Sequence, residues 1–284
     1  KKKNSTNKIM FIDKISSVQN PKIKDIIALQ EKSKERKTRG LFIVEGKREL
    51  NNCFEGGFRM DSIFFCEDYI KEHNILSICK NQIVNDKNGL KLYSVSKNVY
   101  NKIAYRNGTE GVVAIIKENV RTLNDIRLGK NPLILILESV EKPGNLGAVL
   151  RTADAAGVDA ILICDPLTDL YNPNLIRASI GGIFTKQVVT CTSREAYQWL
   201  KNNHISILTA QLQDSVYYYN TDMTVSIAIV FGTESEGLTK FWRDASDTKI
   251  SIPMLGKLDS LNVSVSAAIL CYEAVRQRQK NIDK

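Results

Sequence analysis

The sequence predicts an α/β protein with two domains, the second built on a mostly parallel β-sheet. The 284 residues suffice for two domains at about 150 residues each. Strand patterns alternate with helix patterns in both halves of the chain, which favours this fold class. The apolar runs of the second half are nearly continuous, as in strands that are buried on both faces. We expect a small domain over residues 1–117, a polar linker over 118–130 and the larger domain over 131–284.

The smaller domain is predicted from short apolar runs and amphipathic stretches. Upstream of its first strand, a helix is indicated by four apolar residues on one face, namely Ile23, Ile26, Ile27 and Leu29. The expected strands are Leu41–Val44, Ser62–Cys66 and Gly111–Ile116. The expected helices that follow are Lys47–Glu55 and Tyr69–Lys80.

The larger domain is predicted from a second, longer alternation. Its expected strands are Leu133–Glu138, Ala160–Cys164, Gln187–Thr190, Ile205–Ala210, Ser226–Phe231 and Thr248–Ile252. Two helix starts are indicated between them, by Asn172 before Pro173 and by the capping-box spacing from Thr192 to Glu195.

Composition excludes several classes of protein. Hydrophobic residues make up 43% of the chain and charged residues 25%, as in globular proteins and unlike disordered chains or fibres. Apolar runs such as Leu133–Leu137 are far too short to cross a bilayer, so we expect neither a membrane-spanning nor a secreted protein. The six cysteines form no CxxC pair and only two histidines accompany them, which favours free thiols in a reducing cytoplasm over a metal site.

Positive charge is concentrated near the N-terminus. Residues 1–40 contain 12 Lys/Arg and 4 Asp/Glu, which accounts for +8 of the net +9. This excess indicates a polyanion such as nucleic acid, with a solvated helix and an anionic membrane surface as the alternatives. The candidates for phosphate contacts are Lys22, Lys24, Lys34, Arg36, Lys37 and Arg39.

The larger domain lacks the usual nucleotide-binding signatures. No GxGxxG follows the first strand of either half, and no GxxxxGK[ST] frame is present, so dinucleotide and triphosphate sites are not expected. Polar residues gather instead in three loops.

The first loop, Glu141 to Gly147, opens a helix. Asn145 is a good N-cap residue, and helix N-termini attract phosphate. Arg151 lies six residues further, about 9 Å along the axis, with a side chain that leans back toward the N-terminus. Both are candidates for holding an anion, although a plain cap and a surface cation would give the same pattern.

The second and third loops carry similar chemistry. Gly232 follows an apolar strand and lets a ligand approach the backbone, and Glu234 places a carboxylate at the carboxyl end of the sheet, where α/β proteins bind ligands. The third loop begins at Ile252 and runs through Ser260 and Asn262 into a last helix. That helix is apolar nearly all round, so we expect it to be buried in a subunit interface.

Taken in order, the three loops resemble the SpoU/TrmH family of RNA ribose 2′-O-methyltransferases, within the SPOUT superfamily. The similarity runs from Leu133 to Arg278. The first part of the chain is similar to the family's substrate-binding domain through Asn20–Lys24, Phe42–Gly46 and Gly111–Ile115. The resemblance implies a deep trefoil knot near the C-terminus, an RNA-binding N-terminal domain and an obligate homodimer.

The resemblance also implies S-adenosylmethionine as the methyl donor and a ribose 2′-hydroxyl as the acceptor. Backbone groups of Thr209, Gly232, Ile252 and Leu261 would bind the donor, with Met254 as one wall.

The same resemblance assigns roles at the acceptor. In the family the arginine that matches Arg151 is proposed as the general base. Because a guanidinium does not give up its proton in proteins, we expect Arg151 instead to clamp the adjacent phosphate and stabilise the developing alkoxide. Asn145 would orient the ribose or the arginine, Glu234 would fix the arginine or ribose hydroxyls, and Ser260 and Asn262 would complete the pocket.

Alternatives stay open for the substrate. Ribosomal RNA is expected because a separate basic domain suits a structured target, and transfer RNA is next. A base methyltransferase or a non-catalytic RNA-binding protein on the same scaffold would share these motifs. Tyr217–Tyr219 could stack on bases, although such clusters are more often packing.

Overall fold

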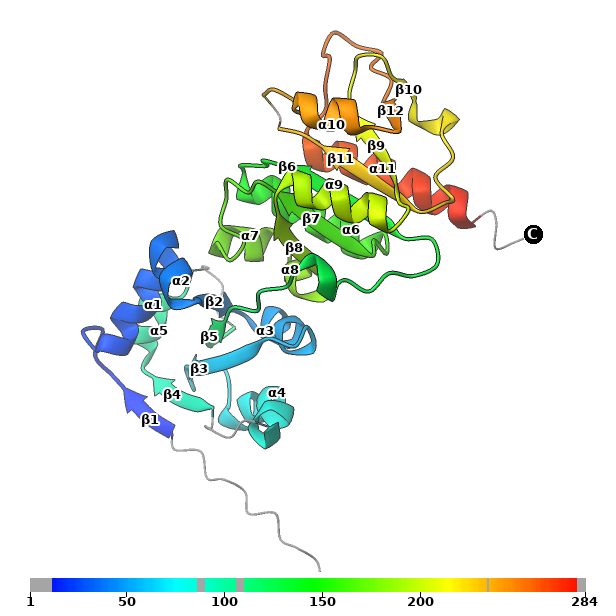
Figure 1. Ribbon diagram of the computed structural model, residues 1–284. Helices are drawn as coiled ribbons and strands as arrows, with labels where there is room; N and C mark the ends of the chain where they lie inside the picture. The colour runs from blue at the N-terminus through cyan, green and yellow to red at the C-terminus, as the bar shows by residue number, and fades with distance from the viewer. Residues whose placement is uncertain (1–11, 86–89, 106–109, 234, 280–284) are drawn as a thin grey trace, which may run out of the picture. The chain divides into compact units, whose positions relative to one another are not determined.

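The computed structural model describes residues 12–85, 90–105, 110–233 and 235–279, with side chains 79–85 left out. The chain divides into two compact units, one of residues up to 119 together with 171–173, the other of residues 120–170 and 174 onward. Each unit has its own β-sheet (Figure 1).

The first unit contains a five-stranded mixed sheet. Its strands are β1 (Ile12–Ile15), β2 (Leu41–Glu45), β3 (Arg59–Phe65), β4 (Lys91–Val95) and β5 (Val112–Lys117), in the order β1-β4-β3-β5-β2. β5 runs antiparallel to both of its neighbours, whereas β1, β4 and β3 are parallel. Its helices are α1 (Pro21–Glu31), α2 (Ser33–Arg39), α3 (Lys47–Glu55), α4 (Glu72–Asn85) and α5 (Lys97–Ile103).

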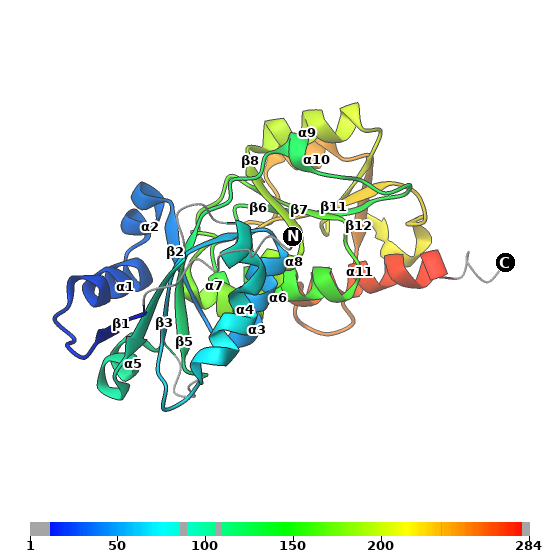
Figure 2. The same cartoon turned by 90° about the horizontal axis from the view of Figure 1, so that it is seen from below.

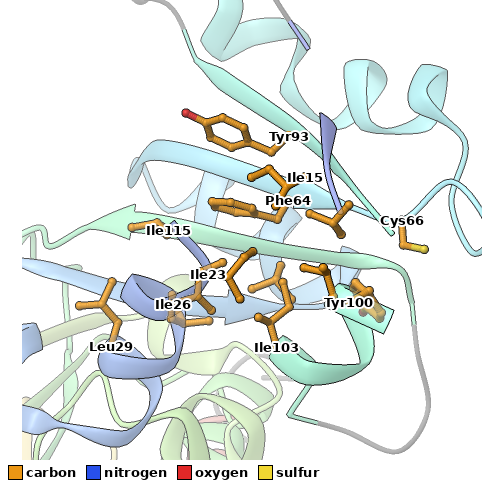
Figure 3. Close-up of a cluster of buried hydrophobic side chains, with 14 residues drawn as sticks. Ile15, Ile23, Ile26, Leu29, Phe64, Cys66, Tyr93, Tyr100, Ile103 and Ile115 are labelled. Atoms are coloured by element: carbon orange, nitrogen blue, oxygen red, sulfur yellow. The ribbon is translucent and has the colours of Figure 1, made fainter. Parts of the chain in front are cut away.

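Helices α1 and α5 cover one face of this sheet. Ile23, Ile26 and Leu29 of α1 are fully buried, as the apolar spacing predicted. They pack with Tyr100 and Ile103 of α5 against strand residues in a single cluster (Figure 3).

The second unit contains a seven-stranded sheet in which every pair of neighbours is parallel. The strands are β6 (Leu133–Glu138), β7 (Ala160–Cys164), β8 (Gln187–Cys191), β9 (Ser206–Ala210), β10 (Val216–Tyr217), β11 (Ile227–Phe231) and β12 (Thr248–Ser251). Their order is β10-β12-β9-β11-β6-β7-β8. The predicted α/β fold class with a mostly parallel sheet is therefore confirmed, and the C-terminal knot stays a prediction.

Helices cover both faces of the larger sheet, which is why all six residues of β6 are buried. Figure 2 shows α9 (Ser193–Asn202) and α10 (Lys240–Ala245) on one face, and α6 (Pro143–Ala155) and α11 (Val263–Gln279) on the other. Two short helices, α7 (Pro173–Ala178) and α8 (Gly182–Thr185), and two 3-10 turns, Leu123–Asp125 and Tyr218–Asn220, complete the described elements.

Arg278 anchors the C-terminal end of α11 where the parallel strands of the larger sheet begin. We call this the amino edge of the sheet, and the opposite side, where the strands end, its carboxyl edge. Its guanidinium donates hydrogen bonds of 2.9 Å to the carbonyls of Asn131, Met223 and Val225. Burial lowers the pKa of this guanidinium. Since α11 begins next to the loop that follows β6, it spans the sheet from its carboxyl edge to its amino edge.

Among the described residues, no helix combines the length and hydropathy that crossing a bilayer requires. No cluster of three or more His, Cys, Asp or Glu side chains within the described ranges is arranged to hold a metal ion. The five cysteines whose side chains are described are free thiols.

Candidate active site

The strand order of the larger sheet places a ligand-binding crevice between β6 and β11. The chain leaves β6 toward β7 on one side and leaves β11 toward β12 on the other. In parallel sheets the loops after two such strands diverge, and ligands bind outside their carboxyl ends. These loops contain Asn145 and Gly232, so the predicted site residues lie at the topological switch point.

The loop after β11 leaves no room for a side chain at Gly232. A Cβ atom there would lie 2.1 Å from the carbonyl carbon of Gly237. Thr233 and Gly237 close the loop with two backbone hydrogen bonds of 3.0 and 3.1 Å. Glu234, a predicted catalytic residue, lies outside the described residues.

Glu138 ties this loop to the end of β6. Its buried carboxylate accepts hydrogen bonds from the backbone N–H of Thr239, at 2.9 Å, and from the Thr239 hydroxyl, at 2.7 Å. The sequence analysis did not predict a role for Glu138. A carboxylate at the end of an otherwise apolar strand is the pattern that could have indicated one.

Asn262 connects the third loop, which precedes α11, with the first loop, which follows β6. Its amide donates a hydrogen bond of 3.2 Å to Oδ1 of Asn145, 117 positions away in the sequence. Its own Oδ1 accepts from the backbone N–H and the hydroxyl of Ser264, at 3.0 and 2.6 Å. Asn262 therefore caps α11 and contacts a predicted catalytic residue at the same time.

The larger of two cavities at this edge has a volume of about 310 Å³, within the range of small-molecule sites. Of the predicted site residues, Gly232, Ile252, Met254, Ser260 and Leu261 line it. Thr209 does not line it; this residue is fully buried, and its hydroxyl donates to Ser246 at 2.7 Å. The residues that follow Thr209 line the cavity in its place, namely Ala210, Gln211, Leu212 and Gln213.

Charged residues of this cavity were missed by the sequence analysis. Glu236 and Asp259 lie in its wall, with Arg243 of α10. The first two belong to loops that the sequence marked as functional, whereas Arg243 stands in a helix whose sequence carries no such signal.

The smaller cavity, of about 120 Å³, adjoins the first. Gly232, Thr233, Ser235 and Val263 line both cavities, so the two meet at these residues. The remaining wall of the smaller cavity comes from the loop after β6, with Val140, Glu141, Lys142 and Asn145.

Arg151 lines neither of the two cavities. It lies exposed on α6, and no hydrogen bond or ion pair joins it to another described residue. The segment beside it packs closely on α6, since a Cβ on Gly147 would lie 2.5 Å from Cβ of Ala178, and Gly182 faces the backbone of Leu150.

The predicted phosphate-binding residues of the first unit divide into two groups. Lys22, Lys24, Lys34 and Lys37 are exposed, and Arg39 pairs with Asp25 at 3.1 Å. Arg36 is only 4% exposed. Its guanidinium donates to the carbonyls of Leu29 and Gln30, at 2.6 and 3.0 Å, and so closes the end of α1.

Fold and site together define an α/β protein whose larger unit has two adjoining cavities at the carboxyl ends of its parallel strands, where enzymes of this architecture bind their ligands. The chain belongs to the SpoU rRNA methylase family, whose model matches residues 132–272. A model of the MRM3-like substrate binding domain matches residues 20–114. The predicted resemblance is thereby confirmed.

Known proteins share both units. The chain is 34% identical over 200 residues to the 23S rRNA (guanosine-2′-O-)-methyltransferase RlmB of Bordetella pertussis, covering 68% of this chain and 81% of that protein. A crystal structure of an RNA 2′-O ribose methyltransferase is 36% identical, with a TM-score of 0.77, over 94% of this chain and 99% of that one. The AdoMet-bound rRNA methyltransferase from Sinorhizobium meliloti is 25% identical, with a TM-score of 0.84, over 93% of this chain and 98% of that one.

Proposed function

We propose that this chain transfers a methyl group from S-adenosylmethionine to a ribose 2′-hydroxyl of ribosomal RNA. One observation carries the proposal: two cavities meet at Gly232, Thr233, Ser235 and Val263 on the carboxyl edge of the sheet. A donor in the larger cavity and a ribose in the smaller one are then adjacent. RNA 2′-O-methyltransferases among the relatives support this reading.

The lining of the larger cavity suits S-adenosylmethionine in polarity and charge. Gly232 lets the ligand reach the backbone, and Ile252, Met254 and Leu261 offer an apolar wall for an adenine ring. Glu236 and Asp259 offer carboxylates to a cationic ligand. When bound, the cofactor supplies an electrophilic methyl group on a positively charged sulfur.

The chain's own residues would hold the acceptor. Asn145 lines the smaller cavity, and its side chain is positioned by Asn262, so it can hydrogen-bond a ribose hydroxyl. Arg151 and Glu234 keep the roles that the sequence analysis assigns, as a phosphate clamp and a carboxylate at the ribose. Ser260 lines the donor cavity. No histidine lines either cavity, so a water molecule is our choice of proton acceptor.

We place the enzyme in the cytoplasm, where ribosomal RNA is found, and propose that it works as a homodimer. Val265 and Tyr272 of α11 are 45% and 50% exposed, and Leu261 just before the helix is 39% exposed. The spacing of seven residues places Val265 and Tyr272 on one face of α11. An apolar face of this kind is suited to pairing with the same helix of a second copy.

The dimer is tested by Val265→Asp. We expect the wild-type chain to sediment as a dimer and the variant as a folded monomer, because the variant buries a charge in the contact. The matched control is Thr190→Asp, at an exposed position of β8. A wild-type monomer at the concentration of the methylation assay would reject this part of the proposal.

The activity is tested with the full chain, radiolabelled S-adenosylmethionine and transcripts of 23S rRNA and transfer RNA. We expect label in 23S rRNA, at a position that then resists alkaline cleavage, and its loss in Asn145→Ala. Label at an alkali-sensitive position would indicate base methylation. Cofactor binding without any transfer would indicate a non-catalytic RNA-binding protein.

A further inference from the structure

The wall of the smaller cavity includes a cationic side chain to which neither the motifs nor the donor site assigns a role. Among its lining residues, Lys142 carries the positive charge, and Glu141 beside it carries a negative one. Arg151, the cation that the sequence analysis assigns to the acceptor, does not line this cavity.

The backbone holds Lys142 firmly while its side chain stays exposed. Lys142 is the N-cap residue of α6, with extended backbone angles, and Pro143 occupies the first helical position. Its carbonyl accepts hydrogen bonds from the backbone N–H groups of Asn145 and Leu146, both at 3.1 Å. The ammonium is therefore carried on a fixed backbone, next to the asparagine that we assign to the ribose.

The set of groups in this cavity matches a sugar phosphate. Phosphate is an anion that a lysine binds as a point charge, and ribose hydroxyls donate to carboxylate and amide oxygens. Lys142, Glu141 and Asn145 provide one group of each kind. The amino-acid end of the cofactor also has both charges, but the larger cavity has Arg243, Glu236 and Asp259 for it.

We propose that Lys142 binds a backbone phosphate of the RNA beside the ribose that is methylated. This inference rests on the proposed function and assigns its acceptor subsite. Lys142 fixes the position of the RNA strand relative to the donor by holding one of the two phosphates that flank the ribose, and Arg151 clamps the other.

The test compares Lys142→Ala and Lys142→Arg with the control Lys130→Ala. Lys130 is also an exposed lysine, but it precedes β6, whereas Lys142 follows it, so the two lie at opposite edges of the sheet. Binding of transcribed 23S rRNA is measured between 50 and 200 mM KCl, and S-adenosylmethionine affinity is measured by calorimetry. Thermal melting checks that each variant is folded.

We expect Lys142→Ala to weaken RNA binding about tenfold at low salt and to reduce the salt slope by about one unit, since one phosphate contact is lost. Lys142→Arg should keep most of the affinity, and Lys130→Ala all of it. Cofactor affinity should stay unchanged in all three.

Three results would overturn the assignment. If Lys142→Ala weakens cofactor binding and leaves RNA binding unchanged, the Lys142 ammonium binds the carboxylate of the cofactor instead of an RNA phosphate. Equal effects of Lys142→Ala and Lys130→Ala would leave Lys142 as an ordinary surface charge, and a lowered melting temperature with an unchanged salt slope would make it a structural residue. A wild-type chain that binds 23S rRNA without methylating it would reject the proposed function alone, because the binding measurement needs no turnover.

Discussion

The loop between the two cavities can adopt its conformation only because residue 232 is a glycine. A Cβ atom on Gly232 would overlap the backbone of Gly237, which has no alternative position while the Thr233–Gly237 hydrogen bonds hold. Gly232→Ala should therefore open the loop and lower S-adenosylmethionine affinity at least tenfold, as measured by calorimetry. Gly144→Ala is the control, because a Cβ at Gly144 meets no atom within 4 Å. Equal affinity in both variants would contradict this account.

Arg151 is exposed at the middle of α6, and its proposed role depends on the shape of its head group. A guanidinium binds phosphate in a bidentate manner that an ammonium does not reproduce. Arg151→Ala should lower kcat about 100-fold, and Arg151→Lys should recover little of it, in steady-state assays at saturating cofactor. If the lysine variant regains most of the activity, a point charge suffices and the clamp is wrong.

Single residues also show where sequence patterns stop being informative. Arg36 looks like its basic neighbours in sequence, yet it turns inward because α2 folds back on the last carbonyls of α1. Thr209 was expected among the cofactor-binding residues, but the cavity begins one residue later, at Ala210. Neither outcome is visible in residue types, because both depend on where a neighbouring element lies.

At the scale of elements, strands made of continuous apolar runs were predictable, whereas short strands interrupted by polar residues were not. β6 and β7 have the predicted bounds, since both are buried throughout and apolar except at Glu138. β1 and β4 were missed because each has polar residues within a short stretch, and β10 has two residues only.

Helix α9 begins with the capping box that the sequence predicted. The side chain of Glu195 accepts from the backbone and the hydroxyl of Thr192, both at 2.8 Å. These hydrogen bonds lower the pKa of Glu195 below its ordinary value. Because the folded-state pKa is depressed, the contribution to stability is present above the unfolded pKa of about 4.3 and is lost as the pH falls through the folded value.

Glu195→Gln tests this linkage. Glutamine keeps a capping hydrogen bond but not the charge. The wild type should melt about 1–2 °C above the variant at pH 7, and the difference should shrink as the pH falls below about 4, as measured by circular dichroism. A difference that stays constant with pH would show that the carboxylate charge has no part in it.

At the scale of the whole molecule, α11 joins the two edges of the larger sheet. Arg278 supplies the anchor at the amino edge through carbonyls of two separate segments, Asn131 before β6 and Met223 and Val225 before β11. Arg278→Met keeps the length of the side chain but leaves those carbonyls without this donor. It should reduce the free energy of unfolding by about 2–4 kcal/mol in urea titrations. A loss below about 0.5 kcal/mol would mean that water replaces the guanidinium at no cost.

The long-range geometry of the site was the part that sequence could not provide. The three loops were found from their residues, but the contact between Asn145 and Asn262 depends on a helix returning across the sheet. The division of the crevice into two adjoining cavities depends equally on how the strands are ordered. Residue types indicate which chemistry is available, whereas strand order decides which groups meet.

The path of α11 also has a consequence for how the enzyme comes into being. Asn262 and the helix that follows it are synthesised after every other described residue of the two cavities. While that stretch is still inside the exit tunnel, Asn145 lacks its hydrogen bond with Asn262 and the wall formed by Val263 is missing. Modification of RNA by a growing chain is thus precluded until its last helix has been released and docked.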